Sequence, residues 1–204
     1  NDNDCVTDLC QVEIPSTEEK LVSLNIYIIR KSLLTSWIEQ AYARGYVDFE
    51  KDILFREVEN GKIYAKEIMS YAAIVDDVKT YFNESMKVLK EDVRNELFET
   101  GRKVYTKVKD EVPTIYGEKA EIKNSMVADG CIINGTVENC IIFRGVQIEE
   151  GAVVKNSVIM QNSLIQSGVN LNHAVIDKSV VIRKNKTLVG QENYPVVVGK
   201  NAVV

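Results

Sequence analysis

The stretch GVQIEEGAVVKNSVIMQNSLIQ, residues 145–166, repeats small, apolar and polar residues about every six positions. Stepping by six from residue 122 to residue 188 gives twelve positions, of which ten are aliphatic, Ala or Cys. The 45% hydrophobic content of the whole chain would give about five. The neighbouring register, at residues 149, 155, 161 and 167, is polar. The six-step positions are Ile122, Ala128, Asn134, Cys140, Val146, Ala152, Val158, Leu164, Asn170, Ile176, Ile182 and Leu188.

A six-residue repeat is typical of a parallel β-helix with a triangular cross-section, in which each side is a short strand plus a turn. Three sides make a coil of about 18 residues, so residues 120–190 predict about four coils. Inward residues must be small where two sides meet, which would account for Ala128, Cys140 and Ala152. Gly145 and Gly151 are expected at tight corners. The predicted helix is left-handed, an exception to the right-handed crossover rule, whereas an antiparallel sheet has a period of two.

The first half of the chain has no such repeat and is predicted to be mixed α/β. Residues 21–29, LVSLNIYII, are typical of a buried strand, and residues 62–75 are also expected to form strands. Helices are predicted from residue 31 to Gly45, from the cap Asp48 to a turn at residues 60–61, and as one long amphipathic helix over residues 77–97. The first helix is expected to pack through Leu33, Leu34, Trp37, Ile38 and Ala41. The predicted fold class is α+β, with an α/β domain at residues 1–110 and a left-handed β-helix domain at residues 111–204.

Composition and charge exclude several classes of partner. A formal charge of −5 opposes binding to a phosphate backbone, so no nucleic-acid partner is expected. The apolar runs are shorter than the roughly 18 to 20 residues of a membrane helix, so no membrane partner is expected. The start NDNDCVTDLC lacks the pattern of a secretory signal, which indicates either a removed leader or a fragment of a longer chain. The four cysteines are too few for a disulfide framework, and they predict reduced thiols in the cytoplasm.

Motifs that carry chemistry are few. The chain has no G-x-G, hence neither a dinucleotide fingerprint nor a Walker loop. The single histidine, His173, is either a general base or, as base rates favour, an exposed loop residue. A basic group near the end of the repeats can hold a phosphate, although solvated corner residues are the simpler interpretation. That group is Lys178, Arg183, Lys184 and Lys186.

Several stretches resemble, in this order, the glucose-1-phosphate adenylyltransferases of bacterial glycogen synthesis. They are SLNIYII (23–29), DFEKDI (48–53), YAAIVDDVKTYFNESMKVL (71–89), PTIYGEKAEIKNSMVADGCIINGTVENCIIFRGVQI (113–148) and AVIDKSVVI (174–182). The resemblance covers nearly the whole chain. It implies a nucleotidyltransferase domain followed by a left-handed β-helix, and, in active members, a Mg²⁺-dependent reaction of ATP with glucose 1-phosphate to give ADP-glucose and pyrophosphate. The chain would start midway through the first domain, in agreement with the absent G-x-G.

Two departures from that family concern catalysis. Active members carry W-R-D-V-G-T after the tyrosine that matches Tyr71, and its aspartate helps to hold Mg²⁺. Here residues 72–74 read AAI, and the hydrocarbon of Ile74 cannot bind a metal that needs oxygen ligands. Asp76 stands two residues late, and the Glu-Lys pair that grips the sugar phosphate is out of place, because Glu19-Lys20 lies too near the predicted strand. The resemblance therefore implies a regulatory, non-catalytic type of subunit, with no catalytic or metal-binding residue and no cofactor of its own.

The resemblance also implies binding residues and partners. Lys178, in the stretch IDKS, resembles an effector-binding lysine, and Arg183 and Lys184 are further candidates for a sugar-phosphate or phosphate effector. Ser23, Asp48 and Lys51 match sugar-phosphate-binding positions that are vestigial here, and Asp48 is equally expected to be a plain helix cap. The expected partner is a catalytic subunit of the same family or a second copy of the chain, in a tetramer. Two alternatives stay open: an active adenylyltransferase whose amino-terminal half carries the nucleotide site, and a hexapeptide acyltransferase that uses His173.

Overall fold

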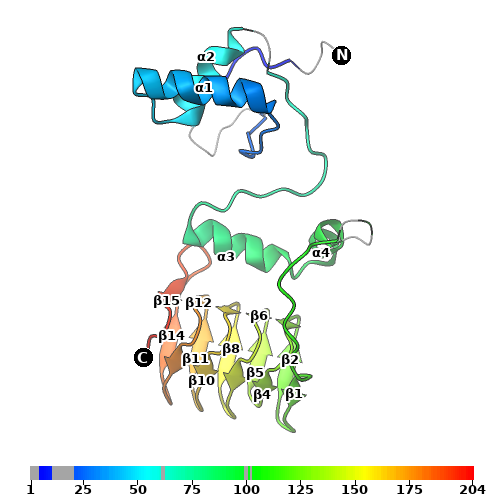
Figure 1. Ribbon diagram of the computed structural model, residues 1–204. Helices are drawn as coiled ribbons and strands as arrows, with labels where there is room; N and C mark the ends of the chain where they lie inside the picture. The colour runs from blue at the N-terminus through cyan, green and yellow to red at the C-terminus, as the bar shows by residue number, and fades with distance from the viewer. Residues whose placement is uncertain (1–4, 11–20, 61–62, 99–100, 102) are drawn as a thin grey trace. The chain divides into compact units, whose positions relative to one another are not determined.

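The computed structural model describes residues 5–10, 21–60, 63–98, 101 and 103–204 of the chain. The chain divides into two compact units, Asn1–Ser70 and Tyr71–Val204. Figure 1 shows helices in the first unit, and helices together with a stack of short strands in the second. The domain boundary expected from the sequence, between residues 110 and 111, stays a prediction.

The described residues of the first unit form three helical segments: α1 (Lys31–Arg44), the π-helix η2 (Phe49–Leu54) and α2 (Phe55–Val58). The predicted end of α1 is confirmed, because Gly45 adopts a left-handed conformation, with a φ of 70°, that glycine reaches without strain. The predicted start of η2 is also confirmed. The Asp48 side chain accepts hydrogen bonds from the backbone N–H groups of Glu50 and Lys51 at 3.0 and 2.9 Å.

The strands predicted for residues 21–29 and 62–75 are wrong. Residues 21–29 have no regular structure, and Ile26 is 74% exposed. In the described part of residues 62–75, the one β-bridge is the antiparallel pairing of Tyr64 with Cys5, while residues 61 and 62 lie outside the described residues. A strand is held by hydrogen bonds to a neighbouring strand, and an apolar run does not supply that neighbour. The predicted packing face of α1 is likewise incomplete, since Leu33 and Ile38 are exposed.

The long helix predicted over residues 77–97 is two helices, α3 (Val78–Lys87) and α4 (Glu91–Leu97). α3 begins at a capping box formed by Asp77 and Thr80. It ends in a tight turn in which the N–H groups of residues 88–90 bond to carbonyls three residues earlier, at 3.0 to 3.1 Å. The apolar spacing continues through this turn, so periodicity alone does not reveal the break. α3 packs on the β-helix, where Phe82 lies buried against Val158 and Val175.

The strands of the second unit form a parallel β-helix of three five-stranded sheets (Figure 1). The β1 sheet contains β1 (Ile115–Tyr116), β4 (Ile132–Ile133), β7 (Gln147–Ile148), β10 (Leu164–Ile165) and β13 (Val181–Ile182). The β2 sheet contains β2 (Glu121–Lys123), β5 (Thr136–Glu138), β8 (Val153–Lys155), β11 (Asn170–Asn172) and β14 (Thr187–Val189). The β3 sheet contains β3 (Met126–Val127), β6 (Ile141–Ile142), β9 (Val158–Ile159), β12 (Ala174–Ile176) and β15 (Val196–Val198). The predicted β-helix, with about four coils over residues 120–190, is confirmed.

The coils are shorter than the predicted 18 residues. Leu164 pairs with Val181, 17 residues later, and Ile132 pairs with Gln147, 15 residues later. In the regular coils, inward residues therefore follow at intervals of six, six and five rather than at a uniform six. One such inward series, each member at most 1% exposed, is Ile148, Val154, Ile159, Ile165, Leu171, Ile176 and Ile182.

The six-step positions consequently leave the inward face at Val158 and return to it only at Ile176 and Ile182. Cys140 and Ala152 are fully buried, as predicted for small residues at corners, whereas Ala128 is only half-buried. Asn170 is exposed, and Val158 packs outward against α3. The loss of one residue per coil shifts the register, which a constant step cannot follow.

The predicted glycine corners are confirmed. Gly145 and Gly151 have φ values of 66° and 77°, in the left-handed region that glycine tolerates best. A Cβ atom on Gly145 would lie 2.6 Å from Oδ1 of Asn162, so this corner also has no room for a side chain. Asn162 itself takes the equivalent corner of the next coil, with a φ of 58°.

Candidate functional site

Ile74, which the resemblance predicts to replace a metal-binding aspartate, lies on the segment that leads into α3. Ile74 is 42% exposed and offers no oxygen ligand. The two carboxylates that follow it start the helix: Asp77 Oδ1 accepts from the backbone N–H of Thr80 at 2.6 Å, and Asp76 Oδ1 accepts from the Thr80 hydroxyl at 3.0 Å. In the described part of the chain, no three His, Cys, Asp or Glu side chains are grouped to hold a metal ion. The residues at this position do not fit Mg²⁺.

Tyr71 ties this segment to α3. Its hydroxyl donates a hydrogen bond to Oε2 of Glu84, and Glu84 also forms an ion pair of 2.7 Å with Lys87. Burial, together with the hydrogen bond and charge of Glu84, raises the pKa of Tyr71 to about 12. Burial by itself would raise the pKa of Glu84, but hydrogen bonds from Lys87 and Tyr71 hold that pKa below its ordinary value.

We expect the contribution of Tyr71 to stability to disappear at alkaline pH. The pKa of Tyr71 in the folded protein lies above the ordinary value of 10.0, so the contribution is complete below pH 10.0 and is lost as the pH rises toward about 12. Ultraviolet absorbance measures tyrosinate formation directly. The difference between the titration curves of the wild type and Tyr71→Phe should show one tyrosine with a pKa near 12, and a difference centred near 10 would contradict the assignment.

The predicted sugar-phosphate residues Ser23, Asp48 and Lys51 all lie in the first unit. Tyr27 links Ser23 to η2, because its hydroxyl donates to Oε1 of Glu50 at 2.7 Å and lies 3.5 Å from Oγ of Ser23. The structure thus brings Ser23 beside the start of η2. The carboxylate of Asp48 is engaged in the helix cap, and Lys51 is exposed. The displaced Glu19-Lys20 pair lies outside the described residues.

Lys178 lies at the corner between the β3 and β1 sheets, directly after β12. At this corner, from Asp129 to Lys178, four backbone carbonyl groups each accept a hydrogen bond from the next coil, at 2.9 to 3.3 Å, which stacks one corner position of successive coils in register. Neighbouring positions are about 4.8 Å apart, the spacing of paired strands. We call these stacked residues the corner column: Asp129, Arg144, Gln161, Lys178 and Lys200.

The corner column places cations next to α3. Lys178 and Lys200 stand on adjacent coils, and Lys178 is exposed. One coil earlier, Oε1 of Gln161 is buried and has no hydrogen-bond partner among the described residues. Burial raises the pKa of Tyr81 on α3, and the negative charge of Asp177 raises it further, so α3 borders this corner. The arrangement can bind an anion through two cationic side chains.

Arg183 and Lys184 are exposed at the opposite end of β13, together with Lys186. The turn at Ser179 and the strand β13 lie between Lys178 and Arg183, so the two residues stand at different corners of the coil. The structure therefore does not bring the basic residues of the sequence prediction into one group. It pairs Lys178 with Lys200 instead, which sequence spacing missed because the two are distant in the chain. Corner residues recur every 17 positions in the regular coils. Only if the longer last coil is allowed for does this spacing align Lys178 with Lys200.

The sequence predicted an exposed loop residue at His173, but its side chain is half-buried. It occupies a left-handed corner with a φ of 50°, and its ring lies 6.1 Å from that of Phe82. Its carbonyl accepts a hydrogen bond from Val196 N at 2.9 Å. These contacts give His173 a structural role where α3 meets the β-helix.

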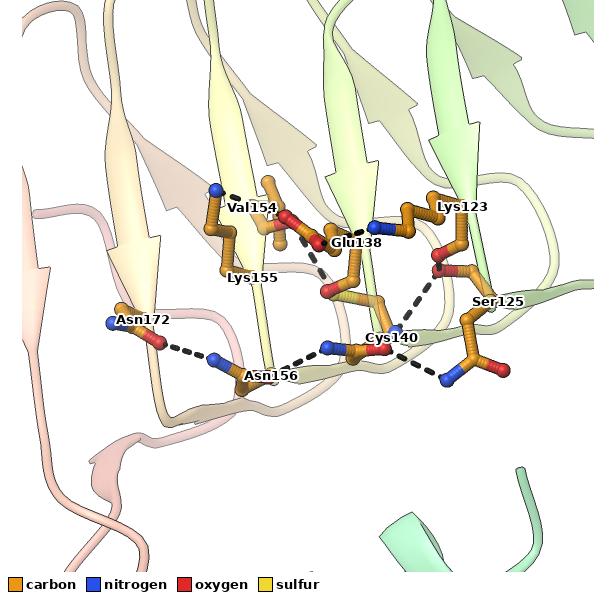
Figure 2. A network of polar contacts seen from close by, with 10 residues as sticks. Lys123, Ser125, Glu138, Cys140, Val154, Lys155, Asn156 and Asn172 are labelled. Atoms are coloured by element: carbon orange, nitrogen blue, oxygen red, sulfur yellow. Dashed lines mark hydrogen bonds and ion pairs between the residues drawn. The ribbon is translucent and has the colours of Figure 1, made fainter. Parts of the chain in front are cut away.

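The largest polar network in the β-helix is structural. Figure 2 shows side-chain amides bonded from coil to coil, and the ion pairs of Glu138 with Lys123 and Lys155 at 3.5 and 2.9 Å. Burial raises the pKa of the nearby Cys140 to about 12, which keeps it a thiol and makes it unreactive. The amide ladder consists of Asn124, Asn139, Asn156 and Asn172.

Comparison with known proteins agrees with this architecture. Residues 111–194 match a family model described as GlmU-like, C-terminal hexapeptide, which supports the left-handed hexapeptide β-helix.

In the described residues, no helix is both long and apolar enough to cross a membrane.

Curated relatives match most of the chain. It is 37% identical over 181 residues to the Glycogen biosynthesis protein GlgD of Bacillus subtilis, an alignment that covers 89% of this chain and 52% of the relative. It is 29% identical to a Glucose-1-phosphate adenylyltransferase of Bacillus cereus, covering 92% and 53% of the two chains, and 28% identical to one of Desulfitobacterium hafniense, covering 83% and 43%. The chain thus spans about half the length of the curated relatives it matches. These relatives identify it as a homologue of the carboxyl-terminal half of the glucose-1-phosphate adenylyltransferase family, GlgD included.

Proposed function

We propose that the protein containing this chain is a regulatory, non-catalytic subunit in the formation of ADP-glucose from ATP and glucose 1-phosphate for glycogen synthesis. It acts in the cytoplasm, in an oligomer with a catalytic subunit of the same family. That partner supplies the Mg²⁺-binding carboxylate for which Ile74 stands here.

One comparison and one observation support the proposal. By the resemblance, Ile74 stands where active members carry the metal-binding aspartate, and the carboxylates of Asp76 and Asp77 are engaged with Thr80 in the cap of α3. An isoleucine cannot be a ligand, and a carboxylate that turns toward a metal would leave the helix start without its cap. The higher identity to GlgD, whose name gives glycogen biosynthesis and no enzymatic activity, than to the adenylyltransferases supports the same interpretation.

Mixing the full-length protein with a catalytic partner tests the proposal. We expect co-expression to give a stable hetero-oligomer in which the catalytic subunit makes ADP-glucose faster, or responds differently to effectors, than it does alone. The control is the same mixture with the catalytic subunit inactivated at its own metal-binding aspartate, which should form no product. Product in that control would show that this chain catalyses the reaction.

We further propose that the corner column binds the phosphate group of an effector through Lys178. Lys178→Ala should weaken binding of inorganic phosphate by the hetero-oligomer about tenfold, since a charge-assisted hydrogen bond contributes about 1.5 kcal/mol or more. Lys200→Ala should act in the same direction. Calorimetric titration with phosphate measures both effects.

Arg183→Ala and Lys184→Ala are the matched controls, because they remove equal charge at the far end of β13. We expect either variant to change phosphate affinity by less than about threefold. A tenfold loss in these variants, with Lys178→Ala unaffected, would move the effector site to the other corner.

A further inference from the structure

The outer faces of the three sheets differ in chemistry. α3 covers part of the β3 sheet, and the β2 sheet carries Lys123, Glu138 and Lys155 in its ion-pair ladder. The β1 sheet presents one outward residue on each coil, and five of the six are apolar. This apolar stripe consists of Ile115, Ile132, Gln147, Leu164, Val181 and Val203, each aligned with the next by strand pairing.

The apolar stripe is open to solvent. Ile115, Ile132 and Val203 are 58%, 38% and 54% exposed, and Leu164 and Val181 are half-buried. With a strand spacing of about 4.8 Å, the stripe is about 24 Å long. A contiguous apolar surface of this kind, bordered by polar corners, marks an interaction site.

Charge on the bordering corners changes sign along the β-helix. Among the described corner residues beside β1, β4 and β7, five carboxylates outnumber two cations. Those beside β10, β13 and Val203 are five cations and one carboxylate. The first group is Glu111, Glu118, Asp129, Glu149 and Glu150 with Lys119 and Arg144, and the second is Lys178, Arg183, Lys184, Lys186 and Lys200 with Asp177.

We propose that a second copy of this protein binds through the apolar stripe, with the two β-helices antiparallel along their coil axes. A twofold axis along the strand direction, between β7 and β10, places the acidic half of each copy against the basic half of the other. Such an interface is self-complementary, as a twofold dimer requires. Asp129 then faces Lys178 of the second copy, and Gln147 faces its Leu164. A parallel arrangement would place like charges together.

Cross-linking tests the geometry in the full-length protein, with the accessible Cys5 and Cys10 replaced by serine. Gln147→Cys and Leu164→Cys are prepared as separate variants and mixed, because the two residues are neighbours within one chain and a double variant would link internally. A short bismaleimide should link the mixture more efficiently than either variant alone. No excess in the mixture overturns the antiparallel dimer. Protection of the Leu164→Cys thiol from alkylation in monomeric protein also overturns it, since the same chain would then cover the stripe.

Charge exchange gives a second test that does not depend on cysteine. Asp129→Lys and Lys178→Asp should each weaken self-association about tenfold in sedimentation velocity, and the two changes in one chain should restore it. Leu164→Asp should also weaken self-association, whereas its control, Val189→Asp on the exposed outer face of the β2 sheet, should not. Single variants without effect, or a double variant weaker than both, would overturn the proposal.

Discussion

Replacing Val154 with aspartate should abolish the folded β-helix. Val154 is fully buried in the inward series, so the new carboxylate would lie in the apolar core without a partner. An unpaired buried charge costs about 3 to 5 kcal/mol, a large part of the roughly 5 to 15 kcal/mol that stabilises a typical domain. Hydrogen exchange of peptides from residues 140–170 should show lost protection throughout the coil.

The neighbouring residue provides the matched control. Val153 is also a β8 valine, but it is half-buried and its side chain points to the opposite side of the strand. Val153→Asp should cost about 1 kcal/mol or less and leave the exchange pattern intact. Equal damage from the two substitutions would mean that the inward register assigned to β8 is incorrect.

Phe82→Ala should detach α3 from the β-helix. The Phe82 side chain is 1% exposed between Val158 and Val175, and truncating a buried phenylalanine costs about 3 to 5 kcal/mol. The β-helix core lies on the other side of the β3 sheet, so it should keep its fold. We expect proteolysis to cut residues 78–97 rapidly while residues 111–204 stay intact.

Phe98 gives the control for this variant. It is 54% exposed after the end of α4, and Phe98→Ala should change stability by about 0.5 kcal/mol or less.

The NMR signal of His173 also reports the detachment of α3 in Phe82→Ala, because the His173 ring packs against Phe82. An unchanged His173 NMR signal in Phe82→Ala would contradict the packing described here.

The β-helix could be predicted from the sequence because its repeat reports burial directly. The inward face recurs on every side of every coil, so even an imperfect step of six reveals the architecture. Coil length escaped prediction, because a corner shortened by one residue alters the register without altering composition. The strand expected at residues 21–29 failed for another reason. Apolar character predicts burial, but pairing depends on a neighbour that this segment does not contain.

The candidate site was also predictable only in part. The prediction that Ile74 replaces a metal-binding aspartate came from the resemblance, and side-chain chemistry adds only that isoleucine offers no oxygen ligand. The engagement of Asp76 with Thr80 required the structure, because it depends on the geometry of one helix start. Lys178 was selected by resemblance, whereas its alignment with Lys200 arises only when the chain closes the last two coils.

The most direct measurement is ADP-glucose formation by the purified full-length protein alone, with saturating ATP, glucose 1-phosphate and Mg²⁺. The account predicts no product above the enzyme-free blank, because the place of the metal-binding aspartate is held by Ile74. Sustained, Mg²⁺-dependent formation of ADP-glucose without a catalytic partner would contradict it.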